Sequence, residues 1–183
     1  QYGNKYFDEV QAYARAGYVV LYSNPRGSSG YSEEWGRAIR GPVDDGPGWG
    51  SVDYEDLMAV VDTALSQFDF LDGERLGVLG GSYGGYMTSW IVGHTDRFRC
   101  AISERAVNDI ASEDGSSDIG GFFKGYIGAY PWDAPEVYRA ISPLTYAAQI
   151  TTPLLILHSE EDLRCPINQG EQLFTMLRAL GRE

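Results

Sequence analysis

Residues 76–88 read LGVLGGSYGGYMT, an apolar run that passes through two glycines and a serine into helix-forming residues. The spacing Gly80-x-Ser82-x-Gly84 is that of a nucleophile elbow, a sharp strand-to-helix turn that presents a serine hydroxyl at the end of a sheet. Glycines are needed because the turn strains the serine backbone and larger side chains would collide where strand and helix cross. The peptide N–H of Tyr83, at the start of the helix, would then point toward a developing oxyanion.

The elbow pattern is weak by itself, because a chain with 23 glycines would contain it by chance in about one shuffled sequence in five. Its surroundings are more informative. Residues 75–79 have the composition of a buried strand, and residues 83–92 form a helical pattern without proline. This context favours a functional Ser82 over a glycine-rich turn with an incidental serine.

The composition is that of one globular domain of 183 residues, with 43% hydrophobic and 22% charged residues. The net charge of −12 argues against nucleic acid or an anionic membrane surface as a partner. No apolar run is long enough to span a bilayer, and no signal-peptide pattern is present. We therefore expect a cytoplasmic protein without a membrane partner.

The two cysteines, Cys100 and Cys165, follow no disulfide or metal-binding spacing. Both lie in or beside expected strands, so we interpret them as small buried thiols. The sequence indicates no metal site and no cofactor.

Helical and extended patterns alternate along the chain. We expect helices over residues 6–16, 32–39, 51–68 and 167–180, and strands over residues 18–22, 100–103 and 154–158. The alternation predicts an α/β fold with a mostly parallel sheet and helices on both faces. Residues 104–145 show little periodicity, and long excursions of this kind are often functional.

The helix expected over residues 51–68 begins with three acids, Asp53, Glu55 and Asp56. Acidic side chains are favourable at the positive end of a helix dipole. We therefore interpret all three as solvated residues that cap the helix.

Hydrolysis by a serine requires a base, and a carboxylate that orients the base. In an α/β-hydrolase the acid follows the serine in the chain and lies after a later strand. The strand over residues 154–158 runs directly into Ser159 and then Glu160, Glu161 and Asp162. All three acids are candidates by chemistry, and an exposed acidic turn is the alternative.

Neither histidine fits the base. His94 lies about three helical turns after Ser82, which places it about 18 Å away along the helix. We interpret it as a residue that bonds to the last carbonyls of its helix. His158 precedes the acid, which would reverse the chain order of a hydrolase. We therefore expect the catalytic histidine beyond residue 183.

Several segments together resemble the prolyl oligopeptidase family of serine peptidases. Residues 80–88, GGSYGGYMT, resemble its nucleophile motif, and residues 24–31, NPRGSSGY, resemble its loop after the fourth sheet strand. Residues 152–166, TPLLILHSEEDLRCP, resemble the segment that carries its acid. Residues 105–108 and 117–123 point to the acylaminoacyl-peptidase and dipeptidyl-peptidase-like branch.

The resemblance implies a role for particular residues. Ser82 would be the nucleophile, Asp162 rather than Glu160 or Glu161 the triad acid, and the N–H of Tyr83 an oxyanion donor. Arg164 would bind a backbone carbonyl of a peptide, with an ordinary salt bridge as the alternative. A pocket for the residue before the cleaved bond would be lined by Tyr83, Val107, Phe122 and Phe123, for which core packing is the alternative.

The resemblance implies a serine peptidase with an α/β-hydrolase fold, incomplete at both ends, that cleaves short peptides through an acyl-enzyme on Ser82. Residues 1–183 would be part of the catalytic domain, without the family's N-terminal propeller, first strands and C-terminal histidine segment. A carboxylesterase of the same fold and a non-catalytic hydrolase-like binding module are the alternatives. The expected partner is a peptide substrate, and the sequence is compatible with a homo-oligomer.

Overall fold

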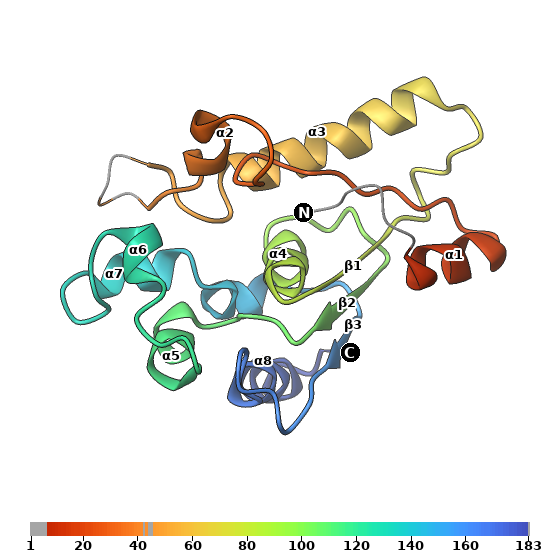
Figure 1. The fold of residues 1–183 in the computed structure, drawn as a ribbon. Coiled ribbons are helices and arrows are strands. Elements are labelled where there is room, and N and C mark those ends of the chain that lie inside the picture. The colour runs from red at the N-terminus through yellow and green to blue at the C-terminus, as the bar shows by residue number, and fades with distance from the viewer. Residues whose placement is uncertain (1–6, 42, 44–45, 183) are drawn as a thin grey trace.

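The computed structural model describes residues 7–41, 43 and 46–182 (Figure 1). Its strands are β1 (Gly77–Gly81), β2 (Cys100–Glu104) and β3 (Leu154–Leu157). Its helices are α1 (Asp8–Arg15), α2 (Glu33–Arg37), α3 (Val52–Gln67), α4 (Tyr83–Val92), α5 (Ile110–Ser116), α6 (Lys124–Ile127), α7 (Pro135–Ala140) and α8 (Asn168–Ala179), with a 3-10 helix, η2 (Pro143–Gln149). No helix within these residues is long and apolar enough to cross a membrane.

The helices predicted from periodicity are confirmed as α1, α2, α3 and α8, and the helix after the serine as α4. Local capping explains some of their ends. The Ser32 side chain accepts a hydrogen bond from the N–H of Trp35 at the start of α2, as expected for an N-cap. Gly17 follows α1 with a φ of 95°, a conformation that glycine adopts without strain.

The strands found in the described residues form one parallel sheet in the order β1-β2-β3. Val78 is opposite Ala101, and Ala101 is opposite Leu154, so these three side chains share one face. Because the strands are parallel, their carboxyl ends meet at a single edge. The predicted parallel α/β architecture is therefore confirmed, and Ser82 lies at that edge.

The helices α4 and α8 pack on the face that carries Ala101 and Leu154. There, Val92 from α4 and Leu173 and Leu177 from α8 are buried against the two strand residues. The opposite face is different, since Leu79, Leu155 and Leu157 are 45%, 52% and 44% exposed. The strand expected over residues 75–79 forms as β1 (Gly77–Gly81), but the expectation that it is buried is wrong, because Leu79 faces the uncovered side of the sheet.

The segment over residues 18–22, predicted as a buried strand, is not part of the sheet. Its side chains are largely exposed, with Tyr18 at 68% and Val19 at 63%. β-branched and aromatic residues favour an extended backbone, but a strand also needs a neighbour with which to form a ladder of hydrogen bonds. In the described chain this segment has no such neighbour, so composition alone was misleading.

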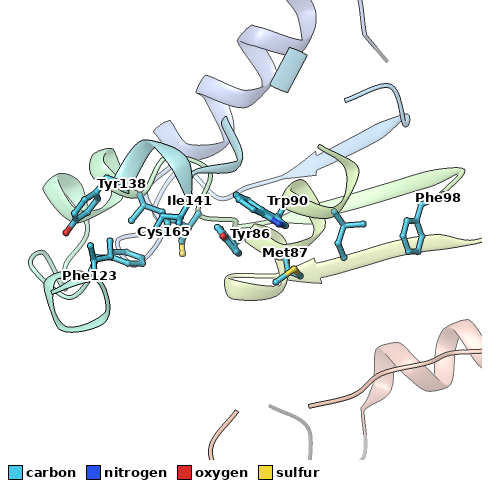
Figure 2. Packing of buried hydrophobic residues seen from close by; sticks show 12 residues of the cluster. Tyr86, Met87, Trp90, Phe98, Phe123, Tyr138, Ile141 and Cys165 are labelled. Carbon is cyan, nitrogen blue, oxygen red and sulfur yellow. The ribbon is translucent and has the colours of Figure 1, made fainter. Parts of the chain in front are cut away.

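The excursion over residues 104–145 folds into short helices, which the sequence did not predict. α5, α6 and α7 contain seven, four and six residues, too few to display a helical period. They share one buried cluster with α4, and Figure 2 shows Ile141 next to Tyr86 of α4, with Phe123 and Tyr138 farther out on the same side. The excursion therefore completes the core next to the serine turn.

Leu173 is fully buried between α8 and the sheet, so we expect Leu173→Ala to destabilise the protein by about 2 to 5 kcal/mol. Met176, on the same helix, is 45% exposed, and Met176→Ala is the matched control, with an expected effect within about 0.5 kcal/mol. Urea unfolding of the full-length protein, followed by tryptophan fluorescence, measures both. Equal losses in the two variants would contradict the packing of α8 on this face.

Candidate active site

Ser82 occupies a strained turn between β1 and α4. Its φ of 58° and ψ of −118° lie in a region that residues with a side chain seldom adopt. The N–H of Ser82 donates to the carbonyl oxygen of Glu104 at 3.0 Å, which ties the turn to the end of β2. The side chain of Ser82 is exposed at this edge of the sheet.

Two glycines allow α4 to lie directly on the strand ends. A Cβ atom at Gly80 would come within 2.6 Å of the backbone of Gly84, and one at Gly85 within 2.6 Å of the carbonyl oxygen of Glu104. Such contacts are shorter than any van der Waals separation, so neither position can hold a side chain without moving the helix. The steric cause predicted for the motif glycines is thus confirmed at Gly80 and wrong at Gly84, where a Cβ atom would meet nothing within 4 Å; the second crowded position is Gly85.

The loop that carries Asp162 approaches Ser82 through Cys165. One carboxylate oxygen of Asp162, Oδ1, accepts the N–H groups of Arg164 at 3.0 Å and Cys165 at 2.9 Å. The Sγ atom of Cys165 lies 4.0 Å from Oγ of Ser82. Asp162 is half-buried, whereas Glu160 and Glu161 are exposed.

Cys165 is buried, as predicted, whereas Cys100 is exposed and contradicts the prediction. Cys100 lies at the start of β2, on the sheet face that α4 and α8 leave uncovered. Burial raises the pKa of the Cys165 thiol to about 11, with the charge of Glu113 adding to the effect. Cys165 is therefore a protonated thiol at neutral pH.

In both histidines one ring nitrogen forms a hydrogen bond with a main-chain carbonyl oxygen. Nδ1 of His94 lies 2.7 Å from the carbonyl oxygen of Trp90, and the His94 ring stacks on the Trp90 ring at 4.2 Å. Nε2 of His158 lies 2.6 Å from the carbonyl oxygen of Cys165. Because a carbonyl only accepts, Nε2 of His158 carries the proton. These contacts agree with the interpretation of His94 as a helix-end residue.

Arg164 pairs with Asp118 of the excursion, with Nε donating to Oδ1 at 2.7 Å. The guanidinium lowers the pKa of Asp118 through this hydrogen bond. Two further hydrogen bonds join the same segments: the N–H of Asp118 donates to the carbonyl oxygen of Leu163, and the Ser117 hydroxyl donates to the carbonyl oxygen of Arg164. The Arg164 side chain stays 59% exposed, which leaves it accessible to a ligand.

The four residues predicted to line a pocket differ in burial. Val107 and Phe123 are each 5% exposed and belong to the core, whereas Phe122 is 41% exposed. Trp49 brings two of them together, since its ring lies 5.1 Å from the Tyr83 ring and 5.2 Å from the Phe123 ring. Sequence analysis missed Trp49, which lies in a glycine-rich loop without a periodic pattern.

Asp53 and Asp56 do not fit their interpretation as solvated capping residues. Asp53 is fully buried, and its Oδ2 accepts the hydroxyl of Tyr83 at 2.6 Å. Asp56 forms an ion pair with Arg26 at 2.7 Å. An acid in the first turn of a helix gives the same sequence pattern whether it faces water or the protein interior, so only the fold reveals these contacts.

Glu113 of α5 is a buried acid that the sequence analysis also missed. It is 2% exposed, and burial raises its pKa to about 7, with the charges of Asp162, Asp114 and Asp118 acting in the same direction. A hydrogen bond with the Cys165 side chain lowers its pKa and only partly offsets these effects. Nothing in the local sequence distinguishes Glu113 from an exposed helical glutamate.

A parallel sheet whose edge carries a strained serine turn, followed by a helix and a later acidic loop, is the arrangement of an α/β-hydrolase. A family model described as "Prolyl oligopeptidase family" matches residues 4–183. The chain belongs to this family, which confirms the resemblance found in its motifs.

Individual relatives agree with this assignment. The "Uncharacterized peptidase YuxL" of Bacillus subtilis is 48% identical over 183 residues, which are all of this chain and 27% of that protein. The "Acylamino-acid-releasing enzyme" of Arabidopsis thaliana is 34% identical and aligns with 97% of this chain and 24% of its own length. The structure of Pyrococcus horikoshii acylaminoacyl peptidase has a TM-score of 0.90 and 38% identity, and the match covers 97% of this chain and 28% of that one.

The chain thus spans about a quarter of the length of each of these proteins.

Glu113 gives the protein a pH-dependent stability. Because its folded-state pKa of about 7 is above the ordinary value of 4.5, its ionisation costs more in the folded state, and stability falls as pH rises from about 4.5 to 7. Glu113→Gln should therefore stabilise the protein by about 1 to 3 kcal/mol at pH 8 and much less at pH 4.5. Chemical denaturation at both pH values measures the difference.

The control is Glu161→Gln, at an exposed position directly before Asp162 in the chain. The free energy of unfolding of Glu161→Gln should not rise above that of the wild type more at pH 8 than at pH 4.5. A gain from Glu113→Gln that is equal at the two pH values would show that the ionisation of Glu113 is not the cause.

Proposed function

We propose that this chain forms part of the catalytic domain of a serine peptidase that cleaves short peptides, in the manner suggested by the names of its acylaminoacyl- and dipeptidyl-peptidase relatives. The observation that carries the proposal is the strained, exposed Ser82 beside the Asp162 loop. The chain aligns with about a quarter of the length of longer peptidases, which supports its being one part of a larger protein.

In the proposed reaction, Oγ of Ser82 attacks the carbonyl carbon of the scissile peptide bond, and its proton passes to a histidine. The imidazolium then gives this proton to the leaving amine, and water hydrolyses the acyl-enzyme with the histidine acting again as base. We propose that this histidine comes from outside residues 1–183, because His94 and His158 both bond to main-chain carbonyls.

Asp162 is suited to orient this histidine. Its two backbone hydrogen bonds use Oδ1 and fix the carboxylate, so that Oδ2 is left to accept an imidazole N–H. The negative charge of the tetrahedral intermediate would be held by the N–H of Tyr83. That N–H belongs to the first turn of α4, where backbone donors have no partner within the helix.

We propose that the peptide substrate contacts Arg164 and an apolar cluster that includes residues of the excursion. Arg164, held by Asp118 and half exposed, is placed to donate to a backbone carbonyl of the peptide. The side chain before the cleaved bond would contact the aromatic and aliphatic cluster of Tyr83, Val107, Phe122 and Phe123. The apolar character of this cluster favours an apolar side chain at that position of the substrate.

We propose a cytoplasmic location. Support comes from the two cysteines, which are both free thiols, as expected in a reducing compartment. Size-exclusion chromatography of the full-length protein with light scattering distinguishes a monomer from a homo-oligomer.

Ser82→Ala should lower kcat for aminoacyl and acyl-aminoacyl chromogenic substrates by about 10⁴-fold or more, because no other group replaces the nucleophile. The full-length protein should also react with a fluorophosphonate at Ser82, as read by intact mass, and Ser82→Ala should not. A folded wild-type protein that is not labelled would favour a non-catalytic binding module. Turnover retained in Ser82→Ala would reject the nucleophile assignment.

Arg164→Ala separates a peptidase from a carboxylesterase. A peptidase should lose about 10- to 100-fold in kcat/KM for peptide substrates, while a simple ester without the bound carbonyl is affected little. The matched control is Arg75→Ala, because Arg75 is also exposed and paired with an aspartate but precedes β1, at the opposite edge of the sheet. Equal losses on peptide and ester would contradict a role of Arg164 in peptide binding.

A further inference from the structure

A buried carboxylate, Asp53 of α3, contacts the residue that follows the proposed nucleophile. Asp53 is fully buried, and its Oδ2 accepts the hydroxyl of Tyr83 at 2.6 Å and the N–H of Gly50 at 3.2 Å. Its Oδ1 accepts the N–H of Tyr54 at 3.0 Å. The shortest of these bonds leaves α3 and joins it to the serine turn.

Helix capping does not explain this arrangement. A capping acid acts from the surface, where its carboxylate remains hydrated. Asp53 is instead removed from water, and burial raises its pKa, while the hydrogen bonds from Tyr83, Gly50 and Tyr54 act in the opposite direction. A carboxylate is expensive to bury, and it is tolerated only where donors surround it.

Tyr83 is held on two sides. Its hydroxyl donates to Asp53, and burial together with the charge of Asp53 raises its pKa well above its usual range, so it remains a donor at all working pH values. Its ring packs edge-on against Trp49 at 5.1 Å and stacks with Tyr86 at 6.0 Å. The side chain of Tyr83 is therefore fixed at its tip and along its ring.

The backbone of Tyr83 is the start of α4. Its N–H is the proposed oxyanion donor, and its Cα is joined through Cβ to the ring whose hydroxyl binds Asp53. An oxyanion donor is effective only when it is held close to its productive position, within about 0.5 Å. The Asp53–Tyr83 hydrogen bond therefore connects α3 to the geometry of the proposed oxyanion site.

We propose that Asp53 is a positioning residue for the hydrolysis proposed above: through the hydroxyl of Tyr83 it fixes the first turn of α4 and aims the Tyr83 N–H at the developing oxyanion. The inference rests on the proposed function, since it assigns Asp53 to that reaction. An oxyanion donor stabilises the transition state rather than the bound substrate. Loss of the Asp53–Tyr83 hydrogen bond should therefore lower kcat.

The test compares Asp53→Asn, Tyr83→Phe and the double variant in the full-length protein. Fluorophosphonate titration counts the active sites, and kcat is then expressed per labelled Ser82. We expect each single variant to lose about 10-fold in kcat per active site, with KM for a peptide changed less than about threefold. The double variant should lose no more than the worse single variant, because both changes break the same bond.

Asp62→Asn is the matched control. Asp62 lies on the same helix and pairs with Arg97 at 2.6 Å, but it is 66% exposed and does not contact Tyr83. Its kcat per active site should equal that of the wild type. If Asp53→Asn fails to fold, Tyr83→Phe decides by the same measurement, since it removes a single oxygen and retains the packed ring.

Three results overturn the proposal: kcat per active site unchanged in Tyr83→Phe, losses that add in the double variant, or an increase confined to KM. A purely structural role would lower the number of labelled sites and leave kcat per site unchanged. If the wild type itself is neither labelled nor active, the proposed function fails, and that result is distinct from an active wild type that is insensitive to Tyr83→Phe.

Discussion

The close approach of α4 to the strand ends is the constraint on which this structure depends. Gly80 and Gly85 leave no room for a Cβ atom, so the helix rests directly on the backbone of β1 and β2. At the same contact the buried hydroxyls of Ser89 and Ser103 lie 2.9 Å apart, which gives two polar groups a partner where water is excluded. Ser82 takes a strained conformation at the point where β1 turns into this helix.

Buried hydrogen bonds fix the segments that surround the contact between α4 and the strand ends. Oε1 of Gln169, on α8, accepts the N–H groups of Asn108 and Asp109 at 2.8 Å each, and thereby fastens the beginning of the excursion. Asp53 fastens α3 to α4 in a similar manner, by a hydrogen bond across the core. Such bonds are individually modest, but their loss leaves a buried group unpaired, which makes the arrangement specific.

Local patterns predicted the parts of the molecule whose geometry is local. The Gly-x-Ser-x-Gly spacing predicted the turn at Ser82, and the apolar period predicted α3, because both patterns are carried by residues that are close together in the chain. The strand expected over residues 18–22 was wrong since strand formation depends on a neighbour that the pattern does not contain. Asp53 and Glu113 were missed for a related reason, as burial arises from residues 30 or more positions away, such as Tyr83 for Asp53 and Cys165 for Glu113.

The hydrogen bond from the N–H of Ser82 to the carbonyl oxygen of Glu104 continues the pairing of β1 with β2 by one residue beyond the strand. A serine on a free loop would move on the nanosecond timescale of loops, whereas this serine shares the rigidity of the ladder. Its amide proton is therefore expected to exchange with solvent only when the sheet itself opens. The hydroxyl of Ser82, the proposed nucleophile, is thus exposed to solvent while its own backbone belongs to the hydrogen-bonded ladder of the sheet.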